Sequence, residues 1–212
     1  IGEKSLLAEA EVIATALDAL RRLGLADAVR VRVNNRALLS ELLEKTGVPR
    51  DHHAATFLAL DKRGKIDDDA LRALLRDNGL AAESIEAAFR LLQVRTLDEA
   101  ESLLGGPTPA SQALRELFSL LDRFGCASAV QFDIAVIRGL GYYTGIVFEG
   151  FDAGGTLRAL FGGGRYDNLL GDIGGRPETA VGLGFGDVVV AELMADRGIR
   201  PASAAARDLA VG

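Results

Sequence analysis

The sequence predicts an α+β fold, in which an antiparallel β-sheet is flanked by helices and interrupted by a small all-helical insertion. Three observations support this prediction. Apolar side chains recur at helical spacing over residues 5–23. Only helical patterns are found over residues 50–125. After residue 128, apolar and polar side chains alternate as they do in half-buried strands.

The N-terminal part is expected to fold as helix, strand and helix. The first helix covers residues 5–23, with Ser5 as its N-cap and Gly24 as the residue that ends it. Valines alternate with arginines at residues 29–33, which predicts a strand with one buried face. A second helix is expected from about residue 36 to residue 45.

Residues 50–126 are interpreted as a helical insertion domain within a core made of residues 1–49 and 127–200. In this insertion, Thr96 and Glu99 have the spacing of a capping box. Residues 201–212 are expected to be a linker and the start of a further domain. Because the chain starts without Met and stops as if a new strand were beginning, we expect it to be a segment of a longer polypeptide.

Four strands are expected after residue 128. Their expected ranges are 130–136, 146–151, 156–161 and 180–185. The second and third are joined by an Asp-Ala-Gly-Gly sequence, which is a hairpin signal. A closing helix is expected at 188–197, with Asp187 as its N-cap.

Composition excludes several classes of protein. No apolar run approaches the about 18 residues of a membrane span, so no membrane contact is expected. A single cysteine excludes an internal disulfide framework, which fits a reducing compartment and predicts a cytoplasmic protein. The net charge of −6 argues against a general nucleic-acid coat, so any RNA contact is expected to be local.

Residues 138–149 are the most informative segment for function. Arg138 and three glycines surround Tyr142 and Tyr143. Glycines allow close approach of a ligand, an arginine offers a planar fork of donors to phosphate or carboxylate, and tyrosines offer aromatic walls with hydroxyls. The segment therefore predicts a pocket for a ligand that is anionic and ring-bearing. Because adjacent residues of a strand point to opposite faces, we expect only one of the two tyrosines to line this pocket.

Two further glycine clusters are candidates for the same site. Residues 162–164 are three glycines, which either cradle a ligand or make a turn, and taken alone the turn is favoured. Arg165 and Asp167 follow and are expected to pair with each other. Residues 182–186 read G-x-G-x-G rather than the dinucleotide fingerprint G-x-G-x-x-G, and they lie outside any βαβ unit. Alternate glycines there favour close approach by a flat ligand or by another backbone.

The remaining chemistry-bearing side chains are interpreted as structural. His52 and His53 lack a third ligand at metal-binding spacing, so they are expected to be solvated and no metal site is predicted. Cys126 has neither histidine near it in the sequence and is expected to be structural.

These motifs resemble the signatures of the histidyl-tRNA synthetase family in order and spacing over nearly the whole chain. The matching runs are Val31–Arg36, Val136–Gly145, Val147–Glu149, Gly163–Asp167 and the glycine strand 182–186. The resemblance implies a class II synthetase catalytic domain with a helical insertion that meets the acceptor arm of tRNA(His). It also implies L-histidine and ATP as substrates, Mg2+ as the accompanying ion, and a homodimer.

The resemblance also implies roles for individual residues. Arg138 would contact the α-phosphate and the carboxylate of histidine during adenylation, and Tyr143, with Tyr142 beside it, would read the imidazole. Tyr166 would line the histidine pocket. Its floor would be formed by Gly163 and Gly164. The ATP side of the site would be formed by Gly182, Gly184 and Gly186.

The chain departs from the family pattern at three points. Val189 stands where the family has an arginine that stacks on adenine, and Gly141 replaces the usual Asp. Motifs 1 and 2 are not in this segment, so we expect it to be inactive alone. The alternative is a non-catalytic relative, the synthetase-like regulatory subunit of ATP phosphoribosyltransferase, which binds histidine without activating it. A nucleotide-binding oxidoreductase is disfavoured because no βαβ pattern is present.

Overall fold

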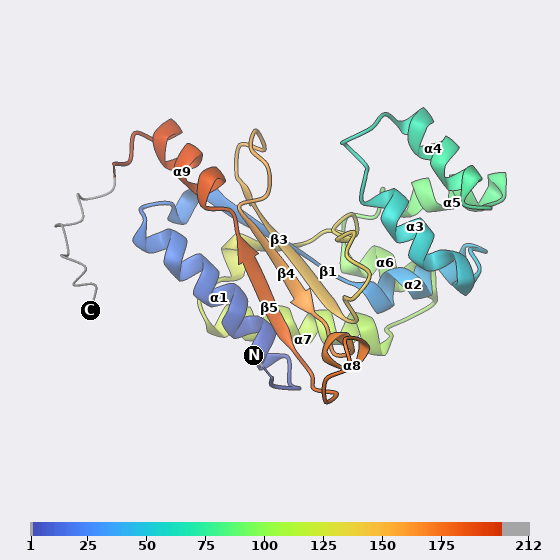
Figure 1. Ribbon diagram of the computed structural model, residues 1–212, viewed down its shortest axis with the longest axis horizontal. Helices are drawn as coiled ribbons and strands as arrows, with labels where there is room; N and C mark the ends of the chain where they lie inside the picture. Colours follow the sequence, from blue (N-terminus) through green and yellow to red (C-terminus); the bar gives the residue numbers. More distant parts are fainter. Residues whose placement is uncertain (1, 201–212) are drawn as a thin grey trace.

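A mixed five-stranded sheet forms the centre of the computed structural model, which describes residues 2–200 (Figure 1). The strands are β1 Val29–Asn35, β2 Val130–Phe132, β3 Ile146–Asp152, β4 Phe161–Arg165 and β5 Val181–Phe185. Their spatial order is β2-β1-β3-β4-β5. The antiparallel arrangement is confirmed from β1 to β5, whereas β2 runs parallel to β1. The expected linker at 201–212 lies outside the described residues.

Helices cover the sheet and also build a lobe beside it. Their bounds are α1 Leu7–Arg22, α2 Arg36–Lys45, α3 His53–Leu60, α4 Asp68–Asp77, α5 Ala82–Leu91, α6 Leu97–Leu104, α7 Pro109–Arg123, α8 Leu169–Asp172 and α9 Asp187–Asp196. α7 packs against α1 and β1, whereas α3, α4 and α5 stand to one side of the sheet (Figure 1). None of the helices described is both long and apolar enough to cross a membrane.

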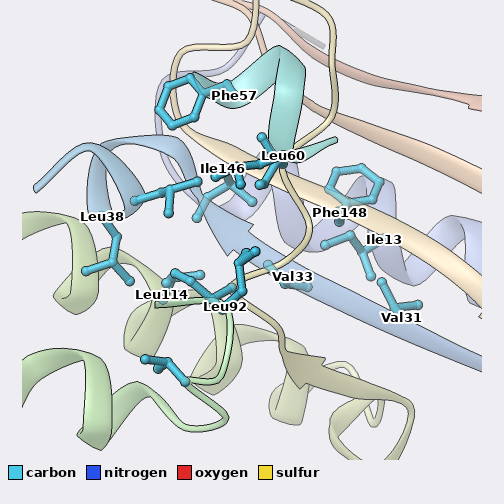
Figure 2. Close-up of a cluster of buried hydrophobic side chains, with 14 of the residues drawn as sticks. Ile13, Val31, Val33, Leu38, Phe57, Leu60, Leu92, Leu114, Ile146 and Phe148 are labelled. Atoms are coloured by element: carbon cyan, nitrogen blue, oxygen red, sulfur yellow. The ribbon is translucent and has the colours of Figure 1, made fainter. Parts of the chain in front are cut away.

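The hydrophobic core runs from the sheet into the helical lobe without interruption. On the sheet side, Ile13 of α1 packs near Val31, Val33 and Phe148, and all four side chains are fully buried (Figure 2). Leu38, Leu92 and Leu114 continue the same cluster through α2, the end of α5 and α7. Burying each of these side chains contributes about 1.5–3 kcal/mol, so the core fixes the lobe against the sheet.

The predicted helix capping is confirmed at α6 and is wrong at α1 and α9. Thr96 and Glu99 form the predicted capping box at α6. Ser5, however, does not cap α1: Leu6 is the N-cap residue, and it is the carbonyl oxygen of Ser5 that accepts a hydrogen bond from Ala8 N. Asp187 is the first residue of α9 rather than its cap, and its carboxylate accepts from its neighbour Val188 N.

The strand predicted at 130–136 is shorter than expected, because β2 ends at Phe132. The Asp133 carboxylate accepts a hydrogen bond from Ala135 N at 2.9 Å, which turns the chain out of the sheet. Ile134 and Val136 remain buried, and their carbonyl oxygens accept from the side-chain amide of Asn34. The alternating burial of this segment therefore resembles that of a strand, although the segment is not part of the sheet.

The strand predicted at 156–161 was placed too early, since β4 spans Phe161–Arg165. The Asp152 carboxylate accepts from the backbone N–H groups of Thr156 and Leu157 and holds the connection as a loop. The glycines at 162–164 are consequently strand residues paired on both sides, with β3 and with β5. The turn favoured for them from the sequence was wrong.

Candidate functional site

Strand register places four glycines side by side on one face of the sheet. Residues directly opposite each other in a ladder point to the same face. One row across the sheet holds Arg32, Glu149, Gly162 and Gly184, and the other holds Asn34, Val147, Gly164 and Gly182. We call this side the glycine face, after Gly162, Gly164, Gly182 and Gly184. The opposite side packs on α1 and is the core face.

Gly163 lies on the core face and not on the glycine face. A β-carbon on Gly163 would lie 2.7 Å from Cζ of Phe148, and it would also overlap the carbonyl oxygen of Gly182. The absence of a side chain at Gly163 therefore serves the packing of β4 against β5 and the core. The structure brings Gly164 to the predicted site and leaves Gly163 behind it.

Three of the predicted site side chains cover the glycine face. The guanidinium of Arg138 lies where a β-carbon of Gly162 would stand. The Tyr143 ring lies over Gly164, with Cδ1 2.9 Å from the position of a β-carbon there. The hydroxyl of Tyr166 lies over Gly182, 2.6 Å from the position of a β-carbon there.

Gly184, in contrast, is uncovered, with nothing within 4 Å of a β-carbon built on it. The open position over Gly184 adjoins the arginine over Gly162, which is its ladder partner, and the tyrosine over Gly182, which lies two residues before it on β5. A flat ligand can therefore rest directly on the backbone beside a cation and a phenol. Gly186 lies outside this patch and serves as the N-cap residue of α9.

Arg138 is held as a preorganised cation by Glu149. Its Nη1 atom donates to Oε1 of Glu149 at 2.6 Å, and both side chains are largely buried. Burial lowers the pKa of the Arg138 guanidinium. The charge and the hydrogen bond of Glu149 raise this pKa by more than burial lowers it, so the net pKa lies above its usual value. The backbone at Arg138 is left-handed, with φ 54°, which is uncommon for a residue other than glycine.

Two residues from outside the predicted site fix the loop that carries Arg138. Arg36, the first residue of α2, is buried over the ring of Phe57 at 4.6 Å and donates through Nη1 to the carbonyl oxygens of Arg138 and Leu140. Asp61, just after α3, accepts from Gly139 N at 3.0 Å. Burial lowers the pKa of Arg36. Sequence reasoning included Arg36 in a matching run but assigned it no role, and it missed Asp61.

The three tyrosines of the chain form one aromatic cluster. Ring centroids are 4.7 Å apart for Tyr142 and Tyr143, and 5.9 Å and 6.3 Å from these two to Tyr166. The expectation that Tyr142 and Tyr143 point to opposite faces was wrong, because Tyr142 lies in a turn and Tyr143 precedes β3. Burial, followed by the hydrogen bond with Tyr143, raises the pKa of Tyr142, so its phenol stays neutral.

Arg165 anchors β4 from the core face. Its Nε and Nη2 atoms contact the two carboxylate oxygens of Glu9 at 2.5 and 2.6 Å, and Nη1 donates to Thr179 Oγ1 at 2.6 Å. The predicted pairing with Asp167 is confirmed at 3.2 Å. Glu9 was missed, although its place four residues before the buried Ile13 puts a charge on the apolar face of α1.

The two histidines and the cysteine each contact a backbone carbonyl oxygen, and of the three only His53 lines a cavity with Tyr143. His53 is buried and its Nε2 atom contacts the carbonyl oxygen of Val48 at 3.1 Å, so the expectation that it is solvated was wrong. Within residues 2–200, no three His, Cys, Asp or Glu side chains are grouped so that they could hold a metal ion. Burial raises the pKa of Cys126, whose thiol contacts the carbonyl oxygen of Phe124.

Comparison with known sequences gives one consistent family. The histidyl-tRNA synthetase family model matches residues 1–186. The chain is 44% identical over 202 residues to the chloroplastic/mitochondrial histidine–tRNA ligase of Arabidopsis thaliana, covering 95% of this chain and 42% of that protein. It is 40% identical over 200 residues to the histidine–tRNA ligase of Haloquadratum walsbyi, covering 92% and 46%. The chain thus spans less than half the length of these relatives.

Solved structures agree on the fold. Histidyl-tRNA synthetase from Nostoc sp. PCC 7120 superposes with a TM-score of 0.78 over 93% of this chain and 49% of that one, at 20% identity, which shows the fold alone. A Bacillus halodurans protein described as an ATP phosphoribosyltransferase regulatory subunit/histidyl-tRNA synthetase gives a TM-score of 0.73 at 28% identity, over 91% of this chain and 51% of that one.

Proposed function

The chain belongs to the histidyl-tRNA synthetase family, and from this membership we propose that the protein of which it is part is a histidine–tRNA ligase. In this reaction the carboxylate of L-histidine attacks the α-phosphorus of ATP, pyrophosphate leaves, and histidyl-adenylate forms. The terminal hydroxyl of tRNA(His) then attacks the carbonyl carbon of the adenylate, and AMP leaves. Mg2+ accompanies ATP as the ion that binds its phosphates.

The observation that carries this proposal is the position of Arg138 beside the open glycine patch. Charge develops on the α-phosphate oxygens during the displacement, and a cation already fixed in place stabilises that charge without reorganising. Glu149 and Arg36 fix Arg138 from its side chain and from its backbone, respectively. A phosphate lying over Gly184 would be within reach of this guanidinium. We assign Gly182 and Gly184 to the ATP side of the site, together with Gly186, which borders the patch as the N-cap residue of α9.

We assign the tyrosine cluster to the recognition of histidine. An imidazole needs polar partners for two ring nitrogens, and a site that leaves polar groups unpaired rejects apolar competitors. Tyr143 and Tyr166 offer phenols and ring edges over Gly164 and Gly182, and Tyr142 packs against both of them. Gly163 supports this floor from the core face. Val189 leaves the adenine without the arginine that the family places there.

The partners follow from the same proposal. We propose that the helical insertion at 50–126 meets the acceptor arm of tRNA(His), with α3, α4 and α5 as the part that stands off the sheet (Figure 1). We further propose that the full protein is a homodimer and acts in the cytoplasm. The name of the Arabidopsis relative places that protein in chloroplasts and mitochondria. The location of the full-length protein in a living cell therefore tests the proposal that it acts in the cytoplasm.

Histidine-dependent exchange of pyrophosphate into ATP tests the function. The full-length protein is expected to catalyse this exchange, and Arg138→Ala is expected to abolish it while the circular dichroism spectrum stays unchanged. Unchanged exchange in Arg138→Ala would remove the assigned role.

The alternative, a regulatory subunit that binds histidine without activating it, is favoured by Val189 and by the description of the Bacillus halodurans protein. It predicts histidine binding in calorimetry with no exchange in the unmodified protein.

A further inference from the structure

One threonine joins the two tyrosines that cover the glycine face. Thr144 directly follows Tyr143 and lies just before β3. Its backbone N–H donates to the carbonyl oxygen of Arg165 at 2.8 Å, and its hydroxyl accepts from the backbone N–H of Asp167 at 3.2 Å. Arg165 and Asp167 are the residues on either side of Tyr166. Thr144 therefore connects the chain at Tyr143 to the chain on both sides of Tyr166.

Three hydrogen bonds fix the two peptide groups that flank the Cα atom of Tyr166. In the first group, the carbonyl oxygen of Arg165 accepts from Thr144 N. The N–H of the same group, which belongs to Tyr166, donates to the carbonyl oxygen of Ala180 at 2.8 Å. In the second group, Asp167 N donates to the hydroxyl of Thr144. Because peptide groups are planar, their orientations set φ and ψ of Tyr166 and thus the direction of its side chain.

The ring of Tyr166 depends on this backbone for its place. Its hydroxyl lies over Gly182 and forms no hydrogen bond with any other residue in the part of the chain that the structure describes. Edge contacts with the rings of Tyr142 and Tyr143 are the aromatic contacts that it makes there. Such contacts are weak and tolerate changes of position. The backbone bonds through Thr144 therefore decide where the phenol of Tyr166 stands.

The hydroxyl of Thr144 works in both directions. A hydroxyl carries one hydrogen and two lone pairs, so it can accept from Asp167 N and also donate. The carbonyl oxygen of Arg165 and the carboxylate of Asp167 both lie 3.4 Å from it as acceptors. That carboxylate is held on its other side by Nη1 of Arg165 at 3.2 Å and by the hydroxyl of Thr179. An apolar side chain of the same shape cannot take the place of Thr144 in this network.

We propose that Thr144 is a positioning residue that sets the distance between the rings of Tyr143 and Tyr166, and that this fixed distance makes the site selective for a ring with polar atoms. The inference rests on the proposed function, which assigns the tyrosine cluster to histidine. A site rejects an apolar ring when that ring leaves the phenols unpaired. Phenols that were free to move would find other partners, and the penalty for the wrong ring would disappear.

Calorimetry with two amino acids of similar size tests this role in the full-length protein. The first is L-histidine, and the second is β-(2-thienyl)-L-alanine, whose ring has no nitrogen and whose Kd is measured by displacement of histidine. Thr144→Val keeps the branched shape and removes the hydroxyl. It should raise the Kd for histidine about tenfold and the Kd for thienylalanine by less than about twofold. Thr144→Ser keeps the hydroxyl and should restore most of the selectivity.

Thr46→Val is the matched control. The hydroxyl of Thr46 also makes a hydrogen bond, to the carbonyl oxygen of Leu43 at 2.9 Å at the end of α2, and its loss should leave both Kd values unchanged. Thermal unfolding shows whether each variant is folded. Asp167→Ala, which removes the carboxylate from the same network, is the second variant and should also lower the selectivity. Equal changes in the two Kd values, or no change in either, would overturn the role of Thr144, because a merely structural residue does not alter their ratio.

Pyrophosphate exchange separates this proposal from the proposed function. Calorimetry requires only that the protein binds histidine, which the ligase and the regulatory alternative have in common. Loss of selectivity in Thr144→Val, with no exchange in the unmodified protein, would support the role of Thr144 and overturn the ligase. Exchange in the unmodified protein, with the same selectivity in Thr144→Val, would overturn only the role of Thr144. An unmodified protein that bound no histidine would overturn both.

Discussion

A β-carbon on Gly162 would overlap the Nη1 atom of Arg138. The obstructing atom is the far end of a flexible side chain, whereas a β-carbon on Gly163 would meet backbone. Gly162→Ala should therefore fold normally and push the guanidinium away from Glu149. A misplacement of about 1 Å costs roughly 100-fold in rate, so histidine-dependent pyrophosphate exchange should fall by about that factor.

The control for Gly162→Ala is Gly171→Ala in α8, where the nearest atom to a new β-carbon is Pro177 Cγ at 3.6 Å, an ordinary contact. Both variants should give similar thermal unfolding curves, and only Gly162→Ala should lose exchange. Full exchange in Gly162→Ala would show that the position of Arg138 on the sheet does not matter.

Arg36 should be required for the rate of adenylation without contacting the substrates. Arg36→Met leaves the carbonyl oxygens of Arg138 and Leu140 without their donor and removes the cation over Phe57. Releasing the loop should lower kcat for exchange about tenfold, which corresponds to about 1.4 kcal/mol. KM for histidine should change little, and Arg36→Lys should restore part of the rate.

Lys65→Ala serves as the control for this loop. It removes the ion pair with Asp61 at 3.0 Å but leaves the bond from Asp61 to Gly139 in place. Exchange by Lys65→Ala should match the unmodified protein. If Arg36→Met changed KM alone, with kcat intact, Arg36 would be a binding residue rather than a positioning residue.

Removing one member of the buried pair of Glu9 and Arg165 should destabilise the folded protein. Glu9 is fully buried and Arg165 is nearly so, and removing one partner leaves the other as an uncompensated buried group. Glu9→Gln should lower the free energy of unfolding by about 3 kcal/mol, measured by urea denaturation. Replacing both, with Glu9→Leu and Arg165→Met, should cost less than the sum of the single changes.

Glu11→Gln on the same helix is the matched control, because Glu11 is exposed. Its urea midpoint should be unchanged. A Glu9→Gln midpoint that also stayed unchanged would mean that water or another group satisfies Arg165.

Asp152 should make folding stability depend on acid pH. Burial raises the pKa of Asp152, but hydrogen bonds from the backbone N–H groups of Leu157 and Thr156 lower it more, so its net pKa lies below the usual value. A lowered folded-state pKa contributes stability that is complete above the unfolded-state pKa, about 3.9, and is lost as pH falls through the folded-state pKa. The stability advantage over Asp152→Asn should thus shrink below about pH 4.

Urea unfolding between pH 7 and pH 3 measures this dependence. Asp51→Asn is the control, since the Asp51 side chain is 81% exposed. Its difference from the unmodified protein should be the same at every pH. An advantage over Asp152→Asn that stayed constant down to pH 3 would contradict the lowered pKa.

Short-range signals were the ones that could be predicted. The capping box of Thr96 and Glu99 depends on residues within one helical turn, and it forms as predicted. The same reasoning failed where a side chain redirected the backbone. Asp133 ends β2 early, and Asp152 delays β4, because each carboxylate binds backbone N–H groups that a strand would have used.

By itself, the sequence determined the helical block, the alternation of the strands and the set of groups available for a site, including Arg138 and the tyrosines. Tertiary structure decided how these groups combine. Strand register placed Gly162 beneath Arg138 and turned Gly163 to the core, and a separation of 156 residues along the chain hid the partnership of Arg165 with Glu9. Periodicity reports only which side of an element is buried. Which residues meet across the sheet depends on register and packing, which act between segments distant in the chain.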